Sequence, residues 1–177
     1  MVPSGFFTIS DLDVVGRANL IAEKLTCEYF GLADDEWRRT PYGVFTRKEV
    51  DPTLFEEDAF AQVVLRKNHN TRVKNPARQE SFAILMQDPN ILQALLRSSQ
   101  PNLWPLVLFI LTHELVHIVR FRKFNVDFNA CAAARDKEER FVHGITREIL
   151  GSLDNTEYVL KMHESHTRVT HRAMTHI

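Results

Sequence analysis

The chain has 177 residues, of which 44% are hydrophobic and 25% are charged, and its formal net charge is −1. This length and composition are typical of one globular domain, and the near-neutral charge argues against a general electrostatic interaction with nucleic acid. Cys27 and Cys131 form no CxxC pair, which favours buried thiols in a reducing compartment. The N-terminus has neither a basic start nor a long apolar run, so we expect no secretory signal and a cytoplasmic protein without membrane insertion.

The first half of the chain predicts a long helix followed by short strands. Ser10 is a candidate N-cap, apolar residues recur at helical spacing to about Phe30, and Gly31 ends the helix. The predicted apolar stripe consists of Leu12, Val15, Leu20, Ile21 and Leu25. We expect a polar loop over 34–41, a strand over 42–46, a strand or short helix end over 59–65, a basic loop over 67–78 and a strand over 81–86. The basic loop could also be a flap that contacts an acidic or phosphate-bearing partner.

The second half predicts mainly helices. Asp88 and Pro89 end the last strand and precede a short helix over 90–97 with an apolar face, and a long apolar helix then runs to about Phe121. The most apolar part, 103–111, is about half the length that spans a membrane, which favours a buried helix. A break over 125–134, a helix over 136–150 that Gly151 ends, and a last helix over 155–166 follow. This order predicts an α+β fold, with a single domain over 1–160 and a histidine-rich tail over 161–177.

The long apolar helix carries an HExxH motif from His113 to His117. Residues four apart lie on the same face of a helix, so both imidazoles can reach one divalent metal, most often zinc. Glu114 follows the first histidine and can act as general base toward a metal-bound water. No other charged residue lies between Leu106 and Val119, as expected for a buried catalytic helix. The alternative is a buried helix whose histidines only satisfy hydrogen bonds, but two core histidines beside a buried glutamate would be costly without a metal.

A third metal ligand is expected from the next helix. Arg120 and Lys123 stand where the metzincin extension HExxHxxGxxH would have its glycine and third histidine. The following helix offers Glu138 and Glu139, and His143 shares a face with Glu139 because the two are four residues apart. Glu139 is the preferred ligand and Glu138 the alternative. His143 is a candidate catalytic partner or substitute ligand, or an ordinary surface histidine.

With these residues the chain resembles the HExxH zinc metallopeptidases, the zincins, and most closely the gluzincin branch. In that branch a glutamate about twenty residues after the second histidine completes the zinc site, and Glu138 and Glu139 lie at about that distance from His117. The resemblance implies a small mixed β-sheet packed on the buried HExxH helix, with a ligand helix after it. It also implies an edge strand that binds an extended peptide, for which 59–65 and 81–86 are the candidates.

Half of the eight histidines lie in the tail, at His163, His166, His171 and His176. We expect a frayed polar terminus, with the alternatives that one of these histidines folds back as a third ligand or transition-state stabiliser, or that the tract binds metal weakly.

The predicted function is a zinc-dependent metallohydrolase, a protease that cleaves peptide bonds in a peptide or protein substrate. In this hypothesis Zn²⁺ is the cofactor, Glu114 is the general base, and His143 or a tail histidine stabilises the oxyanion. The alternatives are a catalytically inactive zincin-like domain that works in regulation or protein interaction, and a helical interaction protein whose motif is coincidental.

Overall fold

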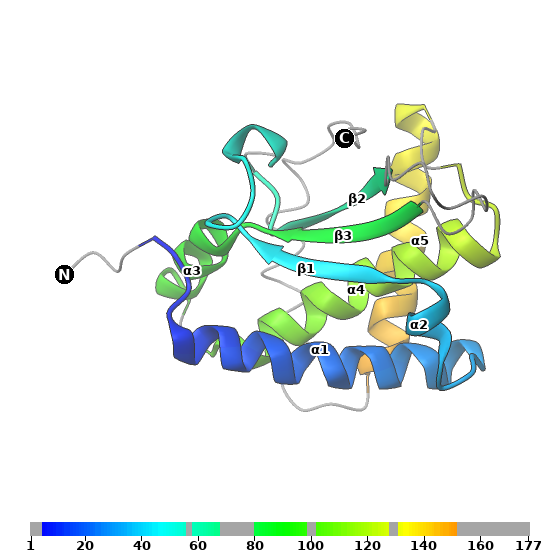
Figure 1. Cartoon of the computed structure of the whole chain (residues 1–177), viewed down its shortest axis with the longest axis horizontal. Coiled ribbons are helices and arrows are strands. Elements are labelled where there is room, and N and C mark those ends of the chain that lie inside the picture. The colour runs from blue at the N-terminus through cyan, green and yellow to red at the C-terminus, as the bar shows by residue number, and fades with distance from the viewer. Residues whose placement is uncertain (1–4, 56–57, 68–79, 99–101, 128–130, 152–177) are drawn as a thin grey trace, which may run out of the picture.

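The protein has an α+β fold, as expected, in which five helices accompany a small mixed sheet in the described part of the chain. The computed structural model describes residues 5–55, 58–67, 80–98, 102–127 and 131–151. Helices α1 and α4 lie on the same side of the sheet, and α5 runs across α4 (Figure 1). The elements are α1 (Ile9–Phe30), α2 (Glu36–Arg39), β1 (Tyr42–Thr46), the 3₁₀ turn η1 (Pro52–Leu54), β2 (Ala61–Lys67), β3 (Glu80–Met86), α3 (Asp88–Leu96), α4 (Leu103–Lys123) and α5 (Ala132–Leu150).

The sheet has the strand order β1-β3-β2, with β1 parallel and β2 antiparallel to β3. Side chains alternate between the two faces of a strand, so β3 contributes to two separate cores. Phe82, Ile84 and Met86 belong to the main core that the helices share, whereas Ala83 and Leu85 pack in a smaller cluster. Because β3 pairs on both sides, the expectation that 81–86 could be an edge strand is wrong. Strand β2 lies at one edge of the sheet and contacts α4.

Helix α4 is the centre of the main core. Asn102 caps its start by accepting a hydrogen bond from the backbone N–H of Trp104. Every residue from Leu106 to Val119 is buried, as suits a helix that is apolar around most of its circumference. Among the described residues, α4 is also the one helix long and apolar enough to cross a membrane, and 78% of its most apolar window is buried inside the structure.

Helix α1 packs along α4 but differs from its predicted form. It begins at Ile9, because Thr8 and Asp11 form a capping box, and the expectation that Ser10 is the N-cap is wrong. Of the predicted apolar stripe only Val15 is buried, and Leu20 is 65% exposed. The other residues that α1 buries are small, and they allow the two helices to approach closely: Ala18, Ala22 and Thr26. Gly31 ends the helix, as predicted, and its backbone has the left-handed conformation.

The remaining boundaries shift by a few residues. The predicted loop over 34–41 contains the short helix α2, and the predicted break over 125–134 is too long because α5 already begins at Ala132. The strands over 42–46, 59–65 and 81–86 correspond to β1, β2 and β3, and the helices over 90–97 and 136–150 to α3 and α5. Residues 68–78 of the predicted basic loop (67–78), the predicted last helix (155–166) and the tail (161–177) lie outside the described residues.

Candidate metal centre

Helix α4 places the two motif histidines in its buried middle. His113 and His117 lie one turn apart, are 2% and 4% exposed, and bring their Nε2 atoms to within 3.2 Å of each other. Glu114, between them in sequence, is also buried. The surrounding core is apolar because α4 carries no other charged residue from Leu106 to Val119. The motif therefore lies in the low-dielectric setting that strengthens electrostatic interactions.

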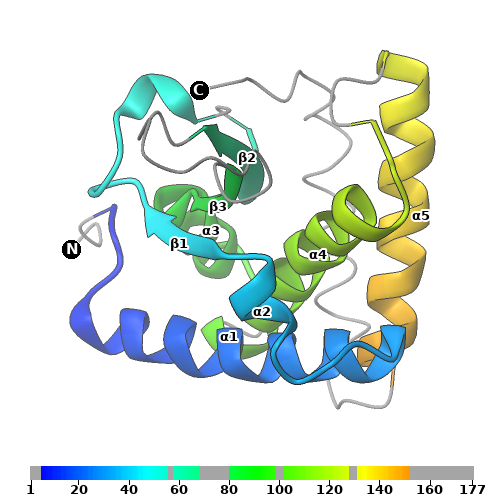
Figure 2. The ribbon, with the colours of Figure 1, turned by 45° about the vertical axis from the view of Figure 1, so that its right-hand side comes forward.

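Helix α5 brings a carboxylate to this histidine pair. Glu139 Oε1 lies 2.9 Å from His113 Nε2, and its Oε2 lies 3.1 Å from His117 Nε2. Figure 2 shows how this is possible, because α4 lies between the sheet and α5. The Glu139 side chain is 27% exposed, whereas the side chains of His113 and His117 are 3% and 5% exposed. Glu139, which follows His117 by 22 residues and comes from a different helix, thus meets the two histidines at one point.

The three side chains fit a zinc ion. Zinc prefers imidazole nitrogen and carboxylate oxygen at about 2.0–2.1 Å, and a tetrahedral arrangement then places ligand atoms about 3.3 Å apart. The Nε2 atoms of His113 and His117 lie 3.2 Å apart, close to that value, and each lies 2.9–3.1 Å from a different oxygen of the Glu139 carboxylate. Within the described residues the cluster offers three ligands, so a tetrahedral ion held by them would have one further position.

The electrostatics of Glu139 suit a metal ligand. Burial raises the pKa of this carboxyl group, but the charge of His113 and hydrogen bonds from His113 and His117 lower it, and the net pKa lies well below the ordinary value. Glu139 is therefore ionised at neutral pH, and the ionised form is the one that coordinates a metal.

The neighbouring acid Glu138 has a different partner. Its carboxylate receives two hydrogen bonds from the guanidinium of Arg120, from Nε to Oε1 and from Nη2 to Oε2, the second at 2.8 Å. The Arg120 guanidinium also lies over the Phe141 ring, 4.2 Å from its centroid. The structure thus directs Glu138, the alternative ligand, to Arg120 and leaves it out of the three-residue cluster. Arg120, which stands at the metzincin glycine position, connects α4 to α5.

His143 lies beside the cluster without joining it. It follows Glu139 by one turn of α5, and its ring centroid is 6.3 Å from that of His113 and 5.6 Å from that of Phe109. Both contacts are edge-on, and the group of potential ligand atoms within 4.8 Å of one another does not include His143. The tail histidines His163, His166, His171 and His176 lie outside the described residues.

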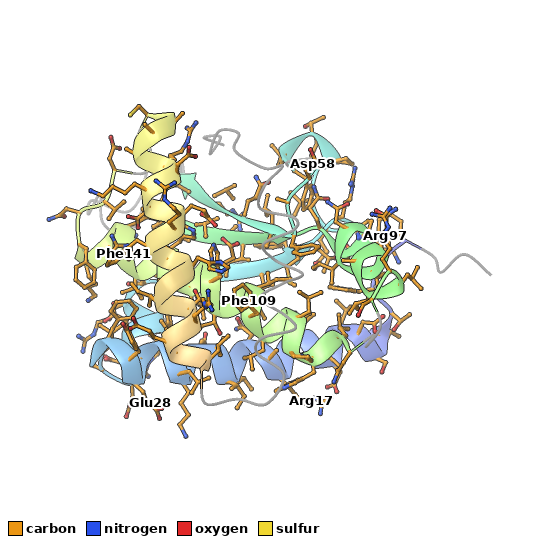
Figure 3. All side chains as sticks on the ribbon, turned by 180° about the vertical axis from the view of Figure 1, so that it is seen from behind. Arg17, Glu28, Asp58, Arg97, Phe109 and Phe141 are labelled. Atoms are coloured by element: carbon orange, nitrogen blue, oxygen red, sulfur yellow. The ribbon has the colours of Figure 1, made fainter. Side chains whose placement is uncertain are left out.

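Aromatic rings bracket the two histidines, a feature that the motif alone did not predict. Phe109 stacks on His113 at 6.2 Å between centroids, and Phe121 stacks on His117 at 5.8 Å. Figure 3 shows Phe109 on α4 beside α5, while Phe141 projects from the other side of α5. The signal was present in the sequence, because Phe109, His113, His117 and Phe121 follow one another at intervals of four residues on a single helix face.

No family model matches the chain, and neither a curated protein nor a solved structure matches it. The functional interpretation therefore depends on the chemistry and geometry of this cluster.

Proposed function

We propose that the protein is a zinc-dependent hydrolase of the zincin type that cleaves peptide bonds. The observation that carries the proposal is the convergence of His113 Nε2, His117 Nε2 and the Glu139 carboxylate at separations of 2.9–3.2 Å. Their order along the chain, two histidines of an HExxH helix and a glutamate from the next helix, is that of the gluzincin ligands. The same likeness supports a zincin-like interpretation of the sheet above α4.

The chemistry divides between the metal and the side chains around it. When bound, zinc supplies a Lewis acid that polarises a carbonyl group and lowers the pKa of a water molecule. His113, His117 and Glu139 would hold the ion. Glu114 accepts the proton of the attacking water and delivers it to the leaving amine. His143, next to His113, is positioned to donate a hydrogen bond to the developing oxyanion.

The position of strand β2 is an argument for a peptide substrate. It lies at the edge of the sheet and contacts α4, the helix that carries the metal site. An edge strand has free backbone donors and acceptors that can pair with an extended chain. We propose that a substrate adds to β2 as a further strand and presents its scissile bond to the metal.

Metal content and turnover of the purified full chain test the proposal together. We expect about one zinc per chain by elemental analysis in the wild type and in Glu114→Gln, and none in His117→Ala. Hydrolysis of a peptide library, followed by mass spectrometry, should fall at least about 100-fold in Glu114→Gln because the general base is lost. Glu28→Gln is the matched control, because Glu28 is an exposed residue of α1 that does not belong to the histidine–glutamate cluster. This variant should keep full activity.

Each result has a distinct meaning. Wild-type protein without stoichiometric zinc would contradict the metal site, and hydrolysis that survives in Glu114→Gln would contradict the assigned base. Zinc bound tightly by a wild type that hydrolyses none of the peptides would instead favour the inactive, zincin-like binding domain.

A further inference from the structure

Three aromatic rings form a continuous stack that ends on a metal-site histidine. His117 and Phe121 lie 5.8 Å apart between centroids with an interplanar angle of 16°, and Phe121 and Phe82 lie 6.3 Å apart at 20°. His117 and Phe121 come from α4, whereas Phe82 comes from the central strand β3. The guanidinium of Arg122 lies over the Phe82 ring, 5.1 Å from its centroid. The stack therefore connects the sheet directly to the imidazole of His117.

The second nitrogen of His117 lacks the contact that usually orients a metal-binding histidine. Such histidines generally donate their other ring N–H to a carboxylate or carbonyl group, which fixes the tautomer and the ring angle. The Nδ1 atom of His117 is buried and has no hydrogen-bond partner within the part of the chain that the structure describes. Contacts with neighbouring rings must then help to fix the orientation of the His117 imidazole. The ring that stacks on its face is Phe121.

We propose that Phe121 is a positioning residue that orients His117 for metal binding by ring stacking, with Phe82 supporting it from the sheet. The inference rests on the proposed metal site. An imidazole that coordinates a cation is electron-poor, and the face of a phenyl ring is electron-rich, so the stack becomes more favourable when the metal is bound. Stacking thus takes over the role that a hydrogen-bonded carboxylate has in other zinc sites.

Zinc affinity of the full chain, measured by competition with a chelator, tests the proposal. Phe121→Leu keeps an apolar side chain but removes the ring, and we expect zinc binding about 10-fold weaker, the lower end of what loss of an orienting contact causes. Phe121→Tyr keeps the ring and should restore wild-type affinity. Phe124→Leu is the matched control, because Phe124 is the C-cap of α4, is 55% exposed, and contacts Phe30 and Arg120 but no metal-site histidine. It should bind zinc as the wild type does.

Spectroscopy separates positioning from a general loss of stability. Cobalt(II) in place of zinc reports ligand geometry by its visible absorption bands, which should change in Phe121→Leu and not in Phe121→Tyr or Phe124→Leu. In the metal-free wild type, the ring proton resonances of His117 should be shifted upfield by the ring current of Phe121, a measurement that needs no variant to fold.

The outcomes distinguish this inference from the proposed function. Equal zinc affinity and equal cobalt spectra in the wild type and Phe121→Leu, or no ring-current shift at His117, would overturn the role of Phe121 and leave the metal site intact. A wild type that binds no zinc would overturn both.

Discussion

The two helices that build the candidate metal centre are held in different ways. Helix α4 is buried from Leu106 to Val119 and cannot turn or slide without disrupting the main core. Helix α5 buries a narrow face, and most of its first three turns are exposed or half-buried. The histidine pair on α4 is therefore fixed by the core itself. The position of Glu139 depends on how a less deeply packed helix docks, so the geometry of the site is most sensitive to α5.

A few specific contacts hold α5 in place beyond its apolar face. Arg120 of α4 binds Glu138 with two hydrogen bonds near the beginning of α5. Tyr29 of α1 donates a hydrogen bond of 2.5 Å to Glu148 near its end. These contacts lie at both sides of Glu139 along the helix, so they set its depth and rotation against the histidines.

The largest effect is expected on zinc affinity, when the two adjacent glutamates of α5 are substituted one at a time. Glu139→Gln removes the negative ligand and should weaken zinc binding by at least about 100-fold, more than loss of an orienting contact. Glu138→Gln is the matched control one residue earlier, and it should leave zinc affinity within about 10-fold, because it disturbs only the docking of the helix. The shift of the unfolding temperature on adding zinc measures the difference, since a ligand stabilises only a folded state that binds it.

The reverse order of effects, with Glu138→Gln abolishing zinc binding and Glu139→Gln tolerated, would mean that α5 rotates when the metal binds. Equal effects of the two substitutions would mean that docking of α5, rather than one carboxylate, limits affinity.

Sequence patterns are more informative for residues of the candidate site that lie on one helix than for residues that come from another element. His113, Glu114 and His117 follow from helical spacing alone, because their relation does not depend on other elements. Spacing gave only a weak preference for Glu139 over Glu138, since consecutive side chains point about 100° apart and either can face α4. In the structure Arg120 binds Glu138 and thereby separates it from the histidines. This contact joins two helices, so helical spacing does not predict it.

In the fold, the predicted start and the predicted buried face of α1 were wrong, because capping residues and small residues were given too little weight. Thr8 and Asp11 already had the spacing of a capping box, which is a stronger start signal than Ser10 alone. The large apolar residues suggested one face for α1, yet α1 contacts its neighbours through Ala18 and Ala22. Close packing of two helices depends on the shape of the surface that they share, which hydrophobic periodicity does not measure.

The ion pair between the two helices should have the next largest effect, on stability. Arg120 and Glu138 are 14% and 15% exposed, so removing one partner leaves the other largely desolvated. We expect Arg120→Gln to lower the free energy of unfolding by about 2 kcal/mol in a denaturant titration. Lys24→Gln is the matched control, because Lys24 pairs with Glu28 on an exposed surface, and it should change stability by less than about 0.5 kcal/mol.

A double-mutant cycle identifies the source of that effect. If the pair acts as a unit, Arg120→Gln combined with Glu138→Gln should cost less than the sum of the single substitutions. Strict additivity would assign the loss to the packing of Arg120 on Phe141 instead.

The smallest expected effect concerns how the two helices begin. Helix α4 starts at Asn102, whose side chain caps a backbone N–H, whereas α5 starts at Cys131, which makes no such hydrogen bond although its backbone has the extended conformation of an N-cap. Cys131→Ser places a hydroxyl acceptor there and should raise the free energy of unfolding by about 0.5–1 kcal/mol, while Asn102→Ala should lower it by about 1 kcal/mol. If the beginning of α5 limits its docking, Cys131→Ser should also tighten zinc binding slightly, and Cys131→Ala, which lacks the acceptor, should do neither. Unchanged stability in Cys131→Ser would show that α5 is held by its contacts with α4 and α1 and gains nothing from its cap.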